Sequence, residues 1–276
     1  MTMMTAESQL SVEQPKQHAK PTVFLAYPFN ERDEWIKYSV PLFLRQHGCN
    51  VLTGERYLGR EIKNAIMADI GRSNLLLAFL TKHNELKSGR WGPSEWVLEE
   101  IGFARGKDLP VVVIRDKAVD ADVGILGDIQ IIEFDADLET YWMFPQLRSA
   151  LRDLLFHGES QDGLAVCHLT KPGRKDRKIK TKQWWDFWMW IDGLEEELSV
   201  ISEVNYEFPE QFDPAIEKGD RHRAFGNYSE TDGPITIKVK VRFDTEKQKT
   251  VKHQITYPDA RISRIELEKT VNAAIQ

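Results

Sequence analysis

The segment Leu75–Leu80 reads LLLAFL, an unbroken run of apolar residues. A strand with water on one face alternates between apolar and polar residues, whereas a strand covered by helices on both faces is apolar throughout. The run is also far shorter than the roughly 20 residues that a membrane-spanning helix needs. LLLAFL therefore predicts a central strand of a parallel sheet with helices on both sides.

Short apolar segments alternate with helical patterns around this run, from residue 22 to about residue 156, which is typical of an α/β fold. Pro41 lies inside the first helical pattern and is expected to kink or split it. We predict a flavodoxin-like, five-stranded parallel sheet with its ligand crevice at the carboxyl ends of the strands. The expected strands are 22–27, 50–53, 75–80, 111–114 and 129–134, and the expected helices are 34–46, 62–70, one that begins after Ser94, and 138–156.

The second half of the chain has a different pattern. The stretch ITIKVKVRF at 235–243 alternates without a break, as half-buried antiparallel strands do. We therefore expect an all-β, immunoglobulin-like sandwich. In the aromatic stretch WWDFWMWID, one strand face carries Trp184, Trp188 and Trp190, and the other carries Trp185 and Phe187. One of these faces must pack in the core, and aromatic side chains left on the other face are a candidate patch for a ligand or partner.

The boundary between the halves is marked by the basic stretch KPGRKDRKIKTK at 171–182. We interpret it as a solvated linker or hairpin loop, with a nucleic-acid contact as the alternative. Residues 261–275 are expected to form a short closing helix. The predicted organisation is a disordered tail at 1–20, the α/β domain at 21–157, the basic linker or hairpin at 158–182 and the β-sandwich at 183–276.

The composition excludes several classes of protein. The chain has 276 residues, of which 41% are hydrophobic and 29% charged, as in ordinary globular proteins. A net charge of −6 argues against a dedicated nucleic-acid binder. The two cysteines predict neither a disulfide framework nor a metal site. No signal-peptide pattern and no Gly-rich phosphate loop are present, so we expect a cytoplasmic protein that is neither a hydride-transfer enzyme nor an ATPase.

The stretch PSEWVLEEIGFARG at 93–106 holds the candidate catalytic residue. With Ser94 as the N-cap, a helical wheel directs the apolar positions toward the sheet and Glu99 toward water. Glu100 falls at the border of the apolar face, one turn from Trp96. A carboxylate there is partly desolvated, which shifts its pKa and favours a functional role. The alternative is an ordinary surface glutamate near the positive end of the helix dipole.

Several segments resemble the TIR domain, over residues 20–156. SEWVLEEIGFARGKDLPVVVI is similar to the family's Ser-x-Trp-Val-x-x-Glu-Ile-Gly-x-Ala segment and the strand that follows it. VFLAYPFNERDEW resembles the first strand and its loop, with AYPF where SY is usual, and SNLLLAFLTK resembles the third strand. GERYLGREI stands where the family has its BB loop. The Glu four residues after the Trp, which is catalytic in enzymatic TIR domains, corresponds here to Glu100.

This resemblance implies an NAD glycohydrolase that cleaves the nicotinamide–ribose bond, with NAD as the substrate and no cofactor. An ionised Glu100 would stabilise the oxocarbenium ion, act as nucleophile or anchor the ribose. Trp96 would stack on the nicotinamide or wall the pocket, with packing against the sheet as its alternative role. The other expected substrate contacts are Tyr27 and Phe29 beside the crevice, Thr81 toward ribose or phosphate, and Arg32 or Arg90 toward the pyrophosphate.

The TIR resemblance also implies self-association. Enzymatic TIR domains often become active only when neighbouring copies pack through the BB loop, and Tyr57, Leu58 and Arg60 are the residues here that could do so. An ordinary exposed turn is the alternative interpretation of this loop.

Residues 182–258 resemble a prokaryotic YEATS-like domain. An aromatic strand, an acidic turn, the pattern Ile-x-x-Val-x-Tyr-x-Phe, Phe212 and a Gly turn occur in the family's order. TDGPIT stands where eukaryotic YEATS domains have Gly-Trp-Gly in their acyl-lysine slot. The ligand or protein partner of this domain therefore stays open, and neither a membrane nor a nucleic acid is expected as a partner.

The two resemblances together imply an NAD-cleaving effector governed by a YEATS-like sensor, in bacterial antiviral defence by abortive infection. Two alternatives remain open. The first is a non-enzymatic TIR scaffold that only oligomerises. The second is a nucleoside or nucleotide N-glycosidase, which would use a similar crevice and a glutamate.

Overall fold

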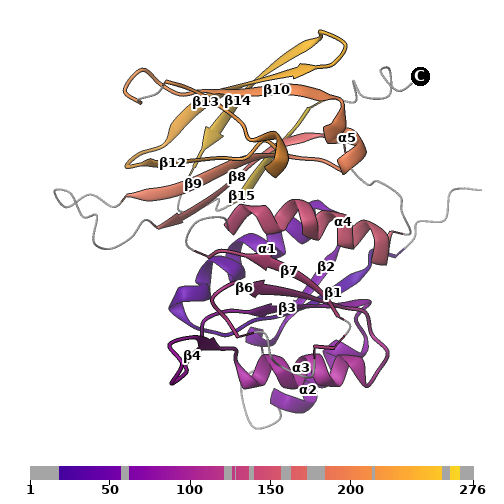
Figure 1. The fold of residues 1–276 in the computed structure, drawn as a ribbon. Coiled ribbons are helices and arrows are strands. Elements are labelled where there is room, and N and C mark those ends of the chain that lie inside the picture. Colours follow the sequence, from indigo (N-terminus) through magenta and orange to yellow (C-terminus); the bar gives the residue numbers. More distant parts are fainter. Residues whose placement is uncertain are drawn as a thin grey trace, which may run out of the picture.

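The computed structural model describes most of the chain as two units stacked on each other (Figure 1). No helix within this described part is long and apolar enough to cross a membrane. The described residues are 19–56, 62–120, 126–127, 129–136, 140–156, 163–172, 184–212, 215–256 and 262–267.

The first unit is built on a five-stranded parallel sheet, as predicted. Its strand order is β2-β1-β3-β6-β7, so the chain leaves β1 toward one edge and crosses to the other through β3. This is the flavodoxin-like order, in which ligands bind beside the carboxyl ends of the first and third strands. Every side chain of β3 is buried, as the LLLAFL run predicted. The strands are β1 Thr22–Ala26, β2 Asn50–Thr53, β3 Leu75–Leu80, β6 Val111–Asp116 and β7 Gln130–Phe134.

Helices cover both faces of this sheet (Figure 1), which explains the apolar strands. Helices α1 (Glu34–Gln46) and α4 (Met143–Leu155) pack on one face, and α2 (Ile62–Gly71) and α3 (Glu95–Arg105) on the other. Pro41 is buried and lies within α1 but does not divide it, because the helix runs without a break from Glu34 to Gln46. Short elements complete the unit: η1 Glu31–Asp33, η2 Gly54–Arg56, β4 Asn84–Glu85, β5 Trp91–Gly92 and η3 Thr140–Trp142.

The second unit consists of two antiparallel four-stranded sheets, β12-β9-β8-β15 and β11-β10-β13-β14. The predicted alternation along β13 is confirmed, because its odd-numbered residues from Ile235 to Val241 are buried against the other sheet. The elements are β8 Ala165–Pro172, β9 Trp185–Asp192, α5 Glu195–Ser199, β10 Ile201–Glu207, β11 Ile216–Lys218, η5 Arg221–Arg223, β12 Asn227–Thr231, β13 Ile235–Phe243, β14 Gln248–Ile255 and β15 Ile262–Glu266.

The structure differs from the sequence-based expectation near the ends of this unit. The predicted closing helix at 261–275 is wrong where it is described, because Ile262–Glu266 forms β15 and pairs with β8. Pairing to an existing strand edge overrides the local helical pattern there. Strand β8 lies within the 158–182 range expected as linker or hairpin, and it pairs with β9 to form a hairpin. The connecting residues 173–183 lie outside the described part of the chain.

The tryptophan face of β9 is the junction between the two units. Trp188 and Trp190 are buried in a core shared with α1 and α4, whereas Phe187, Met189 and Ile191 fill the interior of the sandwich. The Trp190 ring lies parallel to that of Phe144 in α4, with their centroids 5.4 Å apart. The surplus aromatic face expected as a partner patch is therefore covered by this chain's own α/β unit.

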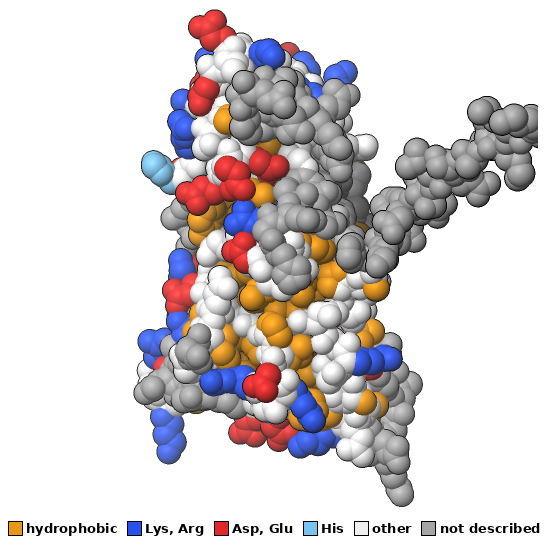
Figure 2. Space-filling view, turned by 90° about the vertical axis from the view of Figure 1, so that its right-hand side faces the viewer, with side chains coloured by type: hydrophobic (Ala, Val, Ile, Leu, Met, Phe, Trp, Pro, Cys, Tyr) orange, Lys and Arg blue, Asp and Glu red, His pale blue; other side chains and the backbone are white. Residues whose placement is uncertain are grey.

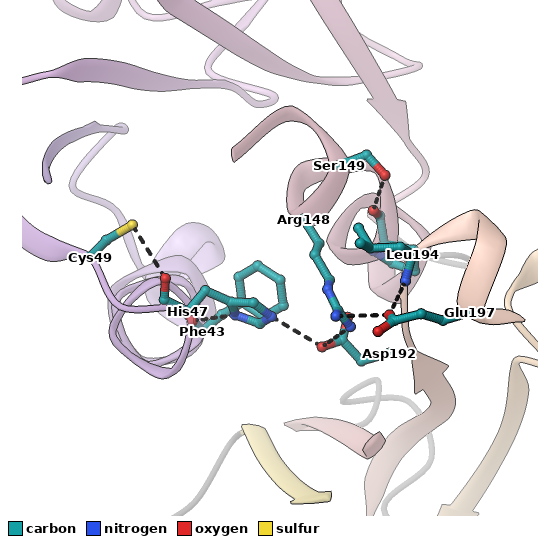
Figure 3. A network of polar contacts seen from close by, with 9 residues as sticks. Phe43, His47, Cys49, Arg148, Ser149, Asp192, Leu194 and Glu197 are labelled. Atoms are coloured by element: carbon teal, nitrogen blue, oxygen red, sulfur yellow. Dashed lines mark hydrogen bonds and ion pairs between the residues drawn. The ribbon is translucent and has the colours of Figure 1, made fainter. Parts of the chain in front are cut away.

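Charged groups join the same two units (Figure 3). Arg148 of α4 contacts Asp192 at the end of β9 at 3.2 Å and Glu197 of α5 at 3.1 Å. His47, just after α1, approaches the same Asp192 carboxylate at 3.1 Å, and Glu197 also accepts the Leu194 backbone N–H. Arg148 and Asp192 are buried, so removing Arg148 leaves the Asp192 carboxylate with only His47 beside it, and breaking a buried pair in this way typically costs about 3–5 kcal/mol.

We expect Gly226→Ala to weaken this junction. A methyl group at Gly226 would overlap the buried Tyr141 ring, which stacks on Trp190. The free energy of unfolding should fall by about 1–3 kcal/mol, as for other overpacked sites. Gly71→Ala is the matched control, because no atom lies within 4 Å of the added methyl position. Equal melting temperatures for the two variants in thermal denaturation would contradict the packing described for Tyr141.

A second expectation concerns acid stability. His253 and His168 are buried inside the sandwich, with His253 Nε2 2.6 Å from His168 Nδ1. Burial lowers the pKa of His253 to about 4, so the unfolded chain binds the proton first as the pH falls. The unfolding free energy should therefore drop from about pH 6.5 toward pH 4, by on the order of 2 kcal/mol from this group. Urea titrations at pH 7 and 4.5 should show a smaller drop for His253→Gln than for the wild type, and an unchanged drop for the exposed His222→Gln.

Candidate functional site

A cavity of about 580 Å³ opens at the carboxyl ends of β1, β2 and β3, where the strand order places a ligand site. We call it the cleft. Its size falls in the range of small-molecule sites, which span roughly 300–1,000 Å³. The lining residues are Tyr27, Pro28, Phe29, Lys37, Gly54, Glu55, Ile62, Ile66, His83, Ser94 and Trp96.

Aromatic side chains from the loop after β1 form one wall of the cleft. Tyr27 is buried, Phe29 is 56% exposed, and their rings meet edge to face at 5.1 Å. Gly54, after β2, packs closely against this wall, because a methyl group there would lie 3.3 Å from the Phe29 ring and 3.0 Å from Ile66. The sequence placed Tyr27 and Phe29 beside the crevice, and both lie in the cleft.

An ion pair within the cleft was not predicted from the sequence. Lys37 of α1 contacts Glu55 at 3.0 Å, and this contact raises the pKa of Lys37. Burial, together with the nearby Glu55 carboxylate, raises the pKa of the Tyr27 hydroxyl. The position of Glu55 just after the second strand of an α/β sheet was the available signal, because acidic residues near that place bind ribose hydroxyls in dinucleotide sites.

The two adjacent glutamates of α3 have the surroundings that the helical wheel predicted. Glu99 is exposed and pairs with Lys63 of α2 at 2.6 Å. Glu100 is only 3% exposed and accepts a hydrogen bond of 2.9 Å from the Trp96 indole Nε1–H. Trp96 lines the cleft and is 38% exposed, whereas Glu100 is not among the lining residues, so the Trp96 indole is the contact that joins Glu100 to the cleft.

The protonation state of Glu100 differs from the expectation. Burial raises the pKa of Glu100 to about 8, opposed by the hydrogen bond from Trp96 and reinforced by the negative charge of Glu99. At pH 7 the carboxyl group in the unliganded protein is therefore mainly protonated, whereas the sequence-based mechanism assumed an ionised side chain. An acid held neutral in an apolar position is a recurrent feature of catalytic carboxyl groups.

Thr81 lies close to the cleft, but its hydroxyl group is already hydrogen-bonded within the protein. Its hydroxyl donates to Asp33 Oδ2 at 2.6 Å, and the same oxygen accepts from Asn30 Nδ2 at 2.7 Å. Asp33 is buried, and this desolvation raises its pKa. The hydrogen bonds among Asn30, Asp33 and Thr81 hold the loop that carries Phe29. Thr81 is therefore a support of this loop and is not among the residues that line the cleft.

Arg32 faces a wider groove of about 1240 Å³ that adjoins the cleft and shares Tyr27, Phe29 and Lys37 with it. The Arg32 guanidinium lies 5.0 Å from the Trp91 ring centre and donates to the Lys82 carbonyl at 3.4 Å. Arg90, the other arginine considered, lies 4.0 Å from Asp120 and lines neither cavity. The predicted self-association residues Tyr57, Leu58 and Arg60 lie outside the described residues.

No protein-family model matches the chain, and no curated protein matches it. Among solved structures, the chain is similar to the Yaf9 YEATS domain recognising an H3K122suc peptide, at 15% identity over 38% of this chain and 81% of that one, with a TM-score of 0.32.

The CMP N-glycosidase BcmB of Clostridium botulinum is similar at 18% identity over 46% of this chain and 97% of that one, with a TM-score of 0.34. A β-glucosidase of Erythrobacter marinus is similar at 7% identity over 86% of this chain and 47% of that one, also with a TM-score of 0.34. Superpositions of this quality decide neither the fold nor the activity.

The raised pKa of Glu100 gives an expectation for stability. The folded state holds the Glu100 proton up to about pH 8, whereas the unfolded state releases it near pH 4.5. The unfolding free energy of the wild type should therefore fall as the pH rises between these values. Glu100→Gln has no proton to lose at this position. Between pH 5 and pH 9, its unfolding free energy should therefore rise by on the order of 3 kcal/mol relative to that of the wild type.

Denaturant titrations at the two pH values measure this gain. Glu99→Gln is the control and should keep most of the wild-type fall, because burial is the main cause of the raised Glu100 pKa and the Glu99 charge is a smaller one. Parallel pH dependences for Glu100→Gln and the wild type would contradict a raised Glu100 pKa.

Proposed function

We propose that the chain is an N-glycosidase that cleaves the nicotinamide–ribose bond of NAD, with Glu100 as its catalytic carboxyl group. The observation that carries the proposal is the burial of this group behind Trp96, at the rim of an aromatic-lined cleft beside parallel strand ends. The resemblance of residues 94–114 to an enzymatic TIR segment selects the same residue.

The chemistry needs few protein groups. The C1′–N bond breaks with its electron pair moving to the nicotinamide nitrogen, so the cationic ring leaves as a neutral molecule without a general acid. Positive charge then develops on the ribose, where an ionised Glu100 would stabilise it. Water adds to C1′ and loses a proton, which yields ADP-ribose. Capture by another nucleophile within the substrate would give a cyclic product instead.

The protonation of Glu100 can respond to the substrate. A positive charge within about 4–6 Å lowers the pKa of a carboxyl group, and the nicotinamide ring of NAD carries such a charge. Binding would therefore favour the ionised form at neutral pH. For the carboxylate to reach C1′, the Trp96 indole must turn away from it, which its partly exposed position allows.

The cleft offers distinct contacts for the parts of the substrate. Tyr27, Phe29 and Trp96 supply aromatic surface for nicotinamide, and Glu55 could accept ribose hydroxyls. Lys37 lines both the cleft and the wider groove, where Arg32 also lies. The pyrophosphate would follow these two cations, with the adenosine in the groove.

We include the second unit in the proposal as a regulatory, YEATS-like sensor. Lys171 of β8 donates to the Ala136 carbonyl at 2.7 Å and lies 5.2 Å from the centre of the Trp35 ring in α1. A change in the sandwich can thus reach the helix that follows the Phe29 loop. Activation by self-association and a role in antiviral defence belong to the same proposal and rest on the TIR and YEATS resemblances alone.

The proposal is tested by incubating the full chain with NAD and measuring the release of nicotinamide. Glu100→Gln should reduce the rate by about 100-fold or more, as expected when a group that stabilises transition-state charge is lost. Glu99→Gln should stay close to the wild type, because its carboxylate pairs with Lys63 at the surface. Activity that survives Glu100→Gln but not Glu99→Gln would overturn the assignment.

The same assay separates the remaining functions. Turnover of nucleosides or mononucleotides in preference to NAD would identify the N-glycosidase alternative, which uses the same carboxyl group. A wild type that stays inactive when forced into multimers would favour the oligomerisation scaffold.

A further inference from the structure

A second cavity, of about 470 Å³, lies where the two units meet. We call it the junction cavity. Three segments enclose it: the N-terminal half of α4, the turn into α5, and the loop between η5 and β12. Its lining residues are Trp142, Pro145, Gln146, Ser149, Gly193, Glu195, Leu198, Ser199, Arg221, His222, Ala224 and Phe225. None of these residues belongs to the cleft, and ligand sites form preferentially at such boundaries between units.

Two walls of the junction cavity are held rigidly. Behind α4 and α5, the Arg148 guanidinium bridges Asp192 and Glu197 (Figure 3). Because these contacts join α4 to the turn before α5, the spacing between the two walls is fixed before any ligand binds. A preformed site of this kind loses little conformational entropy on binding.

The third wall stores backbone strain. Ala224 and Phe225 are consecutive non-glycine residues with φ values of 51° and 57°, in the left-handed region. Such residues cost roughly 1–3 kcal/mol each and persist where the surrounding structure holds them. The Ile191 N–H donates to the Ala224 carbonyl at 2.9 Å, and the Tyr206 hydroxyl donates to the Phe225 carbonyl at 2.7 Å. Arg221, in the η5 turn that precedes this strained loop, lines the cavity.

The side chains define the chemistry of a ligand. Arg221 Nη2 donates to the Ser199 carbonyl at 3.2 Å, which orients the guanidinium. Within the described part of the chain, no carboxylate pairs with it, so its remaining N–H groups can bind an anion. Trp142 and Pro145 supply flat apolar surface, and Glu195 and Gln146 can accept hydrogen bonds. Figure 2 views the molecule from the side on which α5 lies in Figure 1, where acidic side chains gather above hydrophobic ones.

We propose that the junction cavity binds a small molecule made of a flat ring system and one anionic group, with Arg221 holding the anion and Trp142 contacting the ring. Phosphate and carboxylate share this chemistry, so both a mononucleotide and an aromatic acid fit the class. Such a ligand touches α4, α5 and the η5 loop together, so it would stabilise the packing of the two units.

Isothermal titration calorimetry on the full chain tests this proposal with four probes: AMP, indole-3-carboxylate, inorganic phosphate and adenosine. The first two carry a ring and an anion, and the last two carry one of these features each. We expect either AMP to bind at least about tenfold more tightly than inorganic phosphate and adenosine, or indole-3-carboxylate to bind with a dissociation constant below about 1 mM. Binding of AMP would identify phosphate as the preferred anion, and binding of indole-3-carboxylate would identify carboxylate.

Variants then locate the probe. Arg221→Ala should weaken binding by about tenfold or more, as expected for the loss of a charge-assisted hydrogen bond. Ser149→Trp should block the cavity, and Lys218→Ala, which removes a nearby surface cation outside it, should bind as the wild type does. Circular dichroism verifies that each variant is folded. Because the Arg221 side chain is exposed, Arg221→Ala should fold as the wild type does.

Two results would overturn the proposal. One is the absence of binding below about 1 mM for both AMP and indole-3-carboxylate, a limit that corresponds to about 4 kcal/mol. The other is binding that persists in Arg221→Ala and Ser149→Trp but is lost in Phe29→Ala, which would place the probe in the cleft. Neither result depends on NAD cleavage, so this test and that of the proposed function fail independently.

Discussion

The stacking of Trp190 against Phe144 and Tyr141 is the contact on which the rest of the structure depends. These rings belong to one continuous core that includes the inner faces of α1 and α4 and the outer face of the β8–β9 sheet. Helices α1 and α4 therefore contribute to a core that continues from the parallel sheet into the sandwich, while α1 keeps exposed side chains such as Tyr38. The two units consequently form one body, in which α1 and α4 are a middle layer (Figure 1).

Polar groups in this layer follow from the same constraint. Asp192 ends β9 inside the junction, where a lone carboxylate would be costly, and it contacts Arg148 of α4 and His47, the residue that follows α1. Glu197 completes the neutralisation of Arg148 and caps the start of α5 by accepting the Leu194 N–H. The network gives the junction a defined geometry, since each helix contributes one group to a shared carboxylate.

The cleft and the junction cavity have different structural origins. The cleft is a property of the α/β sheet, because its lining comes from strand ends and from the start of α3. The junction cavity exists only because the two units are packed together. Helix α1 reaches from the cleft to the contact between the units: Lys37 in its first turns faces the cleft, and His47 beyond its end contacts Asp192.

The sequence by itself determined the α/β order, the alternating strands of the sandwich and the difference between Glu99 and Glu100. All of these follow from local periodicity, because the period of a helix or strand sets which side chains share a face. It did not determine β15, because a strand edge offered by β8 outweighs the local pattern.

Only the tertiary structure decided the remaining features, since they depend on contacts between segments far apart in the chain. Thr81 is bonded to Asp33, Lys37 is paired with Glu55, and the tryptophan face of β9 is covered by α4. The pKa of Glu100 belongs to the same group, because desolvation is set by everything that packs around a carboxyl group and not by its place on one helix.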